Sequence, residues 1–321
     1  MIYQVRHTTR YHYAQSVSQC HSVAHLLPRN TLFQRCNRAS IAVAPLPVTG
    51  TDRRDYFGNH TYHFSVQTAH KTLEITALSE VEMLAERQSL ALDFGSSCAE
   101  VRTLLRDRDK PDTLQATEFA LGSPMIKPDP ALAEYAGSSF SDDQPFLSCV
   151  RDLTSRIFKD FTYDPISTDV ATPLSVVMKQ RRGVCQDFAH LAIGCLRTLG
   201  YPARYVSGYL ETLPPPGEVK LEGADASHAW FAAYSPTEGW CDFDPTNDLL
   251  ATEQHITTAW GRDYSDVSPM KGSVIGGGAS HRLEVEVDVR RITGADQKGR
   301  PVHSQTRQNQ TQGQTQGQTS G

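Results

Sequence analysis

Three residue types that together can carry out acyl transfer occur in the second half of the chain, in the order Cys185, His228 and Asp244. A thiolate attacks an amide carbonyl, but it needs a base that takes its proton and later protonates the leaving amine. A carboxylate on the far nitrogen of the imidazole fixes the tautomer of that base and stabilises the imidazolium. The three residues therefore supply a nucleophile, a base and an orienting group, provided that the fold brings them together.

The residues around Cys185 predict that this thiol stands at the start of a helix. Apolar residues recur after it at the spacing of one helical stripe, and Gly200 marks the end of that helix. Gly183 precedes the helix, where the backbone must turn and come close to a neighbour. Free backbone N–H groups and the helix dipole favour a thiolate at this end, as Arg181 and Arg182 would if they face it. The stripe consists of Phe188, Leu191, Ala192, Cys195, Leu196 and Leu199.

His228 and Asp244 are predicted to lie on two neighbouring strands joined by a turn. If Trp230 pairs with Asp244, His228 is the diagonal neighbour of the carboxylate on the same face, about 7–8 Å away between Cα atoms. A four-residue loop that paired Ser235 with Trp240 would place the two side chains on opposite faces. The chemistry therefore requires a loop of odd length or a bulge.

Each candidate also has a purely structural interpretation. Cys185 could be an inert core thiol, as most free cysteines are, His228 a satisfied strand histidine, and Asp244 a cap before Pro245. Asp242 lies on the same face of its strand as Asp244 and competes for the orienting role. We assign that role to Asp244, because the end of a strand leaves room for a further partner.

The elements that must position these residues change in kind along the chain. Residues 1–90 are predicted to be short alternating strands, as in a small sandwich or barrel. Seven of the twelve histidines fall there, but no spacing matches a familiar metal site, so we expect histidines on strand surfaces. Helices are expected near 101–105, 113–121, 130–136, 147–161 and 173–180, and strands at 204–210, 227–234, 240–244 and 283–289.

The organisation that follows is an α+β chain in three parts. We expect a β-rich N-terminal domain over 1–90, and a second domain over 91–296 that holds the helices, the core and the late strand. That strand should join an existing sheet, because one strand cannot bury its apolar face alone. Residues 297–321 are mostly Gln, Thr and Gly and are predicted to be a disordered tail.

Composition limits the classes of function. A net charge of −5 over 321 residues gives no reason to expect nucleic acid or an anionic membrane as a partner. The N-terminus has no apolar signal region, and no run of 18 apolar residues could span a membrane. Seven scattered cysteines without a Cys-x-x-Cys pair fit a reducing compartment. We therefore expect a cytoplasmic protein.

Four segments resemble the core of the transglutaminase-like superfamily over roughly residues 145–270. They are Gly-Val-Cys-Gln-Asp-Phe-Ala from Gly183, Gly-Tyr-Pro-Ala-Arg-Tyr-Val-Ser-Gly-Tyr from Gly200, Ser-His-Ala-Trp from Ser227 and Gly-Trp-x-x-Phe-Asp-Pro-Thr-Asn from Gly239. The first 85 residues resemble the β region ahead of that core in bacterial members. Leu27-Pro28-Arg29 and Asp55-x-Phe57-Gly58-Asn59 carry that part, and Gly261–Val267 is similar to the bacterial members too.

The resemblance implies a papain-like fold with Cys185 on a helix and His228 and Asp244 on a sheet. It implies acyl transfer from an amide through a thioester, with a peptide or protein amide as substrate. The acceptor stays open. We favour an amide hydrolase or cysteine protease; the alternatives are a cross-linking acyltransferase that joins glutamine to an amine, and a non-catalytic binding module.

Supporting roles are more loosely indicated. The Cys185 N–H is a natural oxyanion donor, with Gln186 and Tyr163 as candidates for a second. Trp230 and Trp240 are candidates for the walls of a substrate site. The calcium-site carboxylate clusters of animal cross-linking enzymes are not recognisable, so we expect neither metal nor cofactor.

Overall fold

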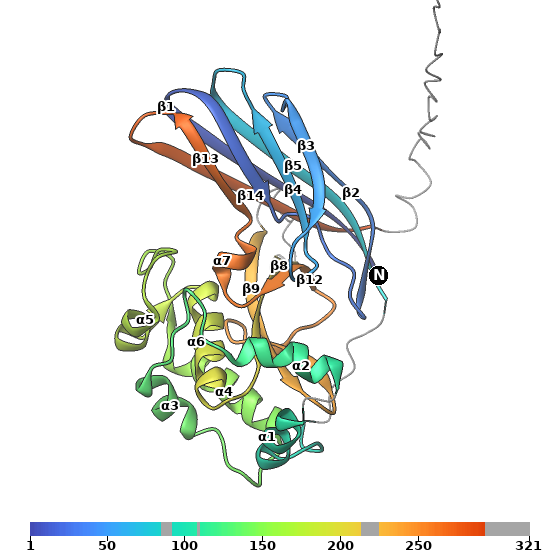
Figure 1. The fold of residues 1–321 in the computed structure, drawn as a ribbon, viewed down its shortest axis with the longest axis vertical. Helices are drawn as coiled ribbons and strands as arrows, with labels where there is room; N and C mark the ends of the chain where they lie inside the picture. Colours follow the sequence, from blue (N-terminus) through green and yellow to red (C-terminus); the bar gives the residue numbers. More distant parts are fainter. Residues whose placement is uncertain (85–91, 108–109, 213–224, 293–321) are drawn as a thin grey trace, which may run out of the picture. The chain divides into compact units, whose positions relative to one another are not determined.

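The computed structural model describes residues 1–84, 92–107, 110–212 and 225–292, and the predicted tail lies outside these ranges. The predicted α+β class is confirmed, with a strand-rich N-terminal region and a core of helices around a second sheet (Figure 1). Residues 1–291 form one compact unit, and the predicted domain boundary near residue 90 stays a prediction.

The N-terminal sheet has seven strands, and the long β1 is its centre. The first half of β1 pairs with β5, and its second half pairs with β4 and β13 after an irregularity between His12 and Val17. The main order is β2-β5-β1-β4-β3, with β13 and β14 also on β1. The strands are β1 (Ile2–Ala24), β2 (Gln34–Ala44), β3 (Thr49–Arg54), β4 (His60–Val66), β5 (His70–Met83), β13 (Met270–Gly276) and β14 (His281–Ile292).

The predicted late strand does join an existing sheet, and that sheet is the N-terminal one. β14 pairs with β1, and its Val287 and Val289 are buried in one cluster with Tyr3 and Val5. The sequence-based division had grouped this strand with the core. Position in the sequence is a poor guide here, because residues 270–292 return to β1, the strand with which the chain begins.

The second sheet carries the core. Five antiparallel strands run in the order β11-β10-β9-β8-β12. Their bounds are β8 (Ala203–Leu210), β9 (Ala226–Ser235), β10 (Gly239–Asp244), β11 (Leu249–Leu250) and β12 (His255–Gly261). The predicted strands at 204–210, 227–234 and 240–244 are confirmed, whereas β12 was not foreseen.

Helices precede this sheet and pack with it (Figure 1). Each predicted helix is found within a few residues of its expected bounds. They are α1 (Cys98–Arg106), α2 (Pro111–Thr117) with a 3-10 turn (Glu118–Ala120), α3 (Pro130–Gly137), α4 (Phe146–Asp160), α5 (Leu174–Gln180) and α6 (Cys185–Thr198). A short helix that was not predicted, α7 (Tyr264–Val267), follows β12. A parallel pair, β6 (Thr162–Tyr163) and β7 (Arg182–Gly183), leads into α6.

The helix α6 is buried on all sides from Asp187 to Arg197, not only along its apolar stripe. β8 and β9 contact it, as do α3, α4 and α5. Its polar residues are satisfied inside the core: His190 accepts from the backbone N–H of Tyr264 at 3.1 Å, and Arg197 donates to the carbonyl of Ala203 at 2.9 Å. A helix fixed on every side holds its first residue in a defined position.

Candidate active site

Cys185 is the first residue of α6, as predicted, and Asp187 organises that helix start. The Oδ2 atom of Asp187 accepts from the backbone N–H of Val184 at 2.9 Å and from the hydroxyl of Thr168 at 2.7 Å. A Cβ atom on Gly183 would stand 2.7 Å from that same oxygen. A glycine is therefore required at position 183, because the Asp187 side chain lies too close for a Cβ atom. Asp187 is the close neighbour that the sequence predicted for this glycine.

The basic pair before the helix does not act on Cys185 as expected. Arg181 has a left-handed backbone with φ of 55°, and its guanidinium lies over the rings of Tyr135 and Phe161. Arg182 is paired with Asp164 at 3.2 Å. Both guanidinium groups therefore have partners other than Cys185.

The β9–β10 hairpin meets the geometric requirement set by the sequence. Ser235 pairs with Gly239, and Phe231 pairs with Phe243. The loop between them has three residues, so its length is odd, and the same register extended by one residue puts Asp244 opposite Trp230. His228 and Asp244 consequently share one face of the sheet.

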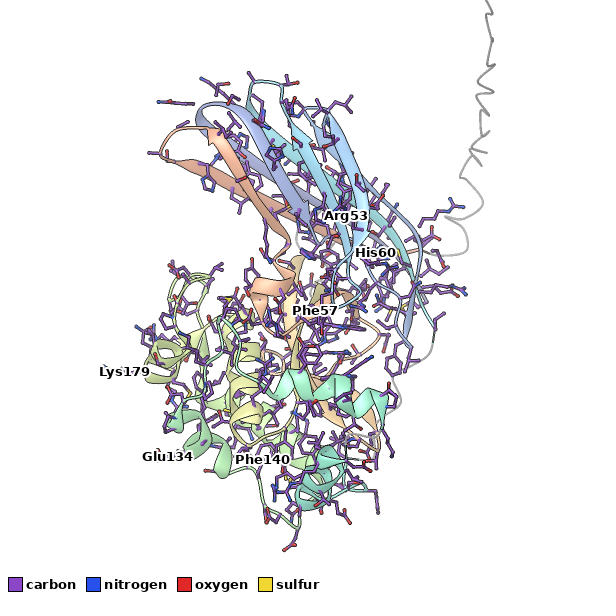
Figure 2. All side chains as sticks on the ribbon, viewed as in Figure 1. Arg53, Phe57, His60, Glu134, Phe140 and Lys179 are labelled. Atoms are coloured by element: carbon purple, nitrogen blue, oxygen red, sulfur yellow. The ribbon has the colours of Figure 1, made fainter. Side chains whose placement is uncertain are left out.

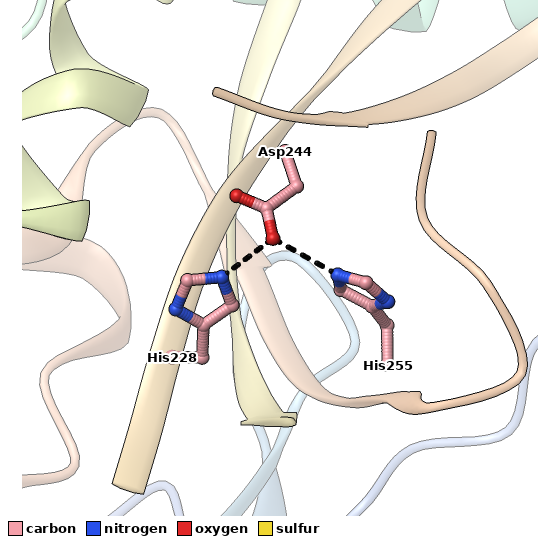
Figure 3. A group of neighbouring side chains, drawn as sticks. All are labelled: His228, Asp244 and His255. Atoms are coloured by element: carbon pink, nitrogen blue, oxygen red, sulfur yellow. Dashed lines mark hydrogen bonds and ion pairs between the residues drawn. The ribbon is translucent and has the colours of Figure 1, made fainter. Parts of the chain in front are cut away.

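The two side chains are in direct contact. His228 Nε2 lies 2.7 Å from Asp244 Oδ2, with 9% of the histidine side chain and none of the aspartate side chain exposed (Figure 3). Burial lowers the pKa of His228, but its interactions, first with Asp244 and then with Cys185, outweigh burial and raise the pKa to about 10. His228 is therefore bonded to the carboxylate and lies close enough to Cys185 for the two groups to influence each other.

Asp244 receives more donors than the hairpin alone would give it. His228, His255 and the Asn247 side chain approach Oδ2 at 2.7, 3.1 and 2.7 Å. The backbone N–H groups of Thr246 and Asn247 donate to Oδ1 at 2.9 and 3.3 Å. Burial raises the pKa of Asp244, but the hydrogen bonds from both histidines hold it well below its usual range. The carboxylate is therefore ionised and held in place.

His255 is a residue of the candidate site that the sequence did not predict. It begins β12, has 1% of its side chain exposed, and reaches Asp244 through the fold of the second sheet (Figure 3). The sequence offered only its place shortly ahead of the Gly261–Val267 segment, because the strand β12 itself was not predicted. No periodicity in the sequence joins it to Asp244, because the contact depends on β12 lying at the edge of the sheet beside β8.

Among the described residues, one group has metal-ligand spacing: His228, Asp244 and His255, with ligand atoms within 4.8 Å of one another. Both histidines direct Nε2 to the same carboxylate oxygen, and the Nδ1 atom of His255 accepts from the backbone N–H of Thr252 at 3.1 Å. The Nε2 atom of His255 must then carry a proton, so it cannot offer a lone pair to a cation. This donor set fits a hydrogen-bonded network and does not fit a metal ion.

The candidate oxyanion residues lie on either side of the helix start. Gln186 directs its side-chain amide to the carbonyl of Val170 at 3.4 Å. Tyr163 is 54% exposed and pairs with Gly183 through the short parallel ladder. Burial and the nearby Cys185 both raise the pKa of Tyr163. Their roles as donors to an oxyanion stay predictions.

The two candidate tryptophans take packing positions. Trp230 is fully buried, donates to Asp242 at 3.3 Å, and sets its ring against that of His255 at 5.1 Å. Trp240 is half-buried, with its ring 5.3 Å from that of Phe119. Trp230 therefore supports the histidines from within the protein and has no surface to offer a substrate. The competing carboxylate, Asp242, bonds to Trp230 rather than to His228.

A buried helix that begins with a cysteine, set against an antiparallel sheet that carries a histidine and an aspartate, defines a papain-like α+β core. Residues 134–245 match the transglutaminase-like superfamily, and residues 3–82 match the bacterial transglutaminase-like N-terminal region. The chain belongs to the transglutaminase-like superfamily, as its motifs indicated.

Relatives span almost the whole chain. Uncharacterized proteins of Mycobacterium tuberculosis and Mycobacterium leprae are 39% and 33% identical, over 89% and 90% of this chain and 92% and 98% of their own lengths. A protein-glutamine gamma-glutamyltransferase of Pseudomonas aeruginosa is 29% identical over 102 residues, 29% of this chain and 15% of that protein.

A solved structure supports the fold as a whole. The structure of a candidate cysteine protease from Cytophaga hutchinsonii superposes with a TM-score of 0.68 at 22% identity, over 91% of this chain and 92% of that one. Among the described residues, no helix is long and apolar enough to cross a membrane. The cytoplasmic location stays a prediction.

Proposed function

We propose that the protein is a thiol enzyme that acts on amide bonds through an acyl-thioester on Cys185. The observation that carries the proposal is the His228 ring hydrogen-bonded to a buried carboxylate 2.7 Å away, with Cys185 at the start of α6 close enough to raise the pKa of that ring. A charged imidazolium beside a thiol at a helix start favours the thiolate, which is the nucleophilic form. Membership of a largely enzymatic superfamily supports the same conclusion.

The reaction divides into two acyl transfers. The Cys185 thiolate attacks the amide carbonyl carbon, and the negative charge moves to the carbonyl oxygen, where the Cys185 backbone N–H is the nearest natural donor. The intermediate collapses as His228 gives its proton to the leaving amine, which leaves an acyl-thioester and a neutral imidazole. His228 then takes a proton from the acceptor, which attacks the thioester and releases the thiolate. Asp244 keeps the ring in place during both transfers.

The acceptor decides between two activities, and we favour water, which makes the protein an amide hydrolase or cysteine protease. Trp230 is buried, so it does not supply the aromatic wall that would protect a thioester from water until an amine arrives. The alternative, a cross-linking acyltransferase, is supported by the partial match to a protein-glutamine gamma-glutamyltransferase.

Labelling followed by product analysis tests the proposal. Iodoacetamide, in limiting amount, should alkylate Cys185 before Cys36, the other cysteine that is not fully buried. A glutamine peptide incubated with the protein should release ammonia. An added primary amine should be incorporated only if the protein is an acyltransferase.

Cys185→Ala should abolish both products, and Cys36→Ala is the matched control that should keep them. If Cys36 or a buried thiol were labelled first and no peptide turned over, the binding-module alternative would stand.

A further inference from the structure

We infer that His255 is a positioning residue for the reaction. It holds the Asp244 carboxylate in place by a neutral hydrogen bond, so that the negative charge of the carboxylate still stabilises the imidazolium of His228. The inference rests on the proposed function. It starts from the finding that two histidines, the partly buried His228 and the buried His255, share one carboxylate oxygen, at 2.7 Å and 3.1 Å (Figure 3).

The hydrogen bonds of His255 determine its tautomer. Its Nδ1 accepts the backbone N–H of Thr252 at 3.1 Å, so that nitrogen has no proton. The proton of the neutral ring must then be on Nε2, which donates to Asp244 Oδ2. If both ring nitrogens of His255 carried a proton, the Nδ1–H would face the backbone N–H of Thr252, and neither group could accept a hydrogen bond from the other. His255 is therefore a neutral, one-directional donor to the carboxylate.

The position of His255 is fixed on every side. Its residue pairs with Leu210 across β12 and β8, and its backbone N–H bonds to the carbonyl of Thr252 at 3.1 Å. The ring packs edge-on against Trp230 with 5.1 Å between centroids, and Trp230 is tethered in turn to Asp242. A donor held this firmly restrains the oxygen to which it donates.

Neutrality is what separates the roles of the two histidines. A cationic donor in the place of His255 would compete for the negative charge of Asp244 and would weaken its stabilisation of the His228 imidazolium. A neutral N–H satisfies a lone pair of the carboxylate without cancelling its charge. The second histidine thus compensates Asp244 for its complete burial while His228 stays the only cation of the pair.

Two substitutions separate this role from packing. His255→Gln can keep a donor near the Nε2 position, whereas His255→Leu keeps the volume and loses the donor. We expect His255→Leu to lower kcat for ammonia release from a glutamine peptide by about tenfold with KM nearly unchanged, because one charge-assisted hydrogen bond is lost. We expect His255→Gln to recover most of that loss.

The rate of Cys185 alkylation by iodoacetamide at pH 7 gives a readout that needs no turnover. It should fall in His255→Leu and recover in His255→Gln. His7→Leu, at a buried histidine of β1 that bonds to Thr9, is the matched control and should change neither rate. If His255→Leu does not fold by circular dichroism, His255→Asn, whose amide is too short to reach Asp244, replaces it.

The outcomes distinguish this inference from the proposed function. If His228→Ala slows alkylation but the donor-free His255 variant alkylates like the wild type, the positioning role is refuted and the proposed function stands. If His255→Gln loses as much as His255→Leu, the donor is not what matters and the inference is again refuted. If His228→Ala itself leaves alkylation unchanged, the proposed function fails first.

Discussion

At the scale of single residues, Asp244 has the largest influence on the site. It is fully buried and accepts hydrogen bonds from two rings, one amide and two backbone N–H groups. Asp242, two residues earlier on the same strand, is half-buried and accepts from the indole of Trp230. The two carboxylates therefore differ in role although the alternation of the strand puts them on one face.

Substitution of these aspartates should rank their roles. We expect Asp244→Asn to lower turnover by between about tenfold and 10⁴-fold, since the amide stabilises the wrong imidazole tautomer. Asp244→Ala should lower it further and cost about 3 kcal/mol of stability, because buried donors lose their acceptor. Asp242→Asn keeps an acceptor for Trp230 and should have the smallest effect.

Steady-state kinetics and urea unfolding of the three variants measure both quantities. If Asp242→Asn lost most of its turnover and Asp244→Asn kept nearly all of it, Asp242 rather than Asp244 would be the residue that orients His228.

The raised pKa of His228 predicts a pH dependence of stability. The pKa is about 10 in the folded protein and near 6.5 in the unfolded chain. Between these values the folded state holds a proton that the unfolded state has lost, so stability from this group is complete below about pH 6.5 and falls until about pH 10. His228→Gln cannot titrate, so its stability deficit relative to the wild type should shrink from pH 6 to pH 10.

Urea midpoints of the two proteins at several pH values give that difference, in which titrating groups that do not interact with His228 cancel. A deficit that grew with pH would contradict the assignment.

At the scale of elements, the start of α6 depends on a contact between two residues three positions apart. Asp187 folds back to the N–H of Val184, and only a glycine at 183 leaves room for it. The parallel ladder of β6 and β7 holds Gly183 from the other side, opposite Tyr163. The thiol thus stands on a helix end that is bonded to its neighbours before any substrate arrives.

Gly183→Ala tests this arrangement. Its Cβ would stand 2.7 Å from Asp187 Oδ2 and 2.8 Å from Asp187 Cβ, so the helix start must shift. We expect a loss of about 1–2 kcal/mol in the free energy of unfolding, as for a lost helix cap, together with slower alkylation of Cys185. Gly137→Ala, at a helical glycine with nothing within 4 Å of the added Cβ, is the control and should match the wild type. Equal behaviour of the two variants would show that Gly183 has no such role.

At the scale of the whole molecule, the N-terminal strands and the second sheet are joined by buried hydrogen bonds. The Asn59 side chain binds both backbone groups of Trp260, and the guanidinium of Arg29 stacks on that indole. Gln34 donates to and accepts from the backbone of Thr257 at 2.7 and 2.8 Å. The ring of Phe57, labelled in Figure 2, lies 5.7 Å from that of Phe119. The N-terminal motif residues Arg29 and Asn59 therefore connect the N-terminal region to β12.

The return of β13 and β14 to β1 predicts how truncation behaves. A fragment of residues 1–84 loses both partner strands and exposes the buried face of Tyr3 and Val5, so we expect it not to fold stably alone. A chain that ends at Ile292 keeps every described strand and should unfold at the wild-type temperature. Circular dichroism and thermal unfolding measure both, and a cooperative transition in the 1–84 fragment would contradict the prediction.

The sequence determined much of this protein, because the relevant information is local or carried by motifs. The helix that begins at Cys185 follows from apolar spacing and a glycine stop, and the β9 and β10 strands follow from their alternation. Whether His228 and Asp244 lie on the same face depends on whether the hairpin loop has an odd or an even number of residues. The observed loop has three residues, which puts both side chains on one face. The sequence motifs indicated the transglutaminase-like superfamily, to which the chain belongs.

Tertiary structure alone decided the rest, because those contacts join residues that no local pattern relates. His255 meets Asp244 only after β12 has paired with β8 on the far side of β9. Arg181 and Arg182 turn from the thiol because Tyr135, Phe161 and Asp164 offer them nearer partners. The last strand pairs with the first because its apolar face must be covered. The alternation of its residues predicts that it needs a partner strand, but not which strand that is.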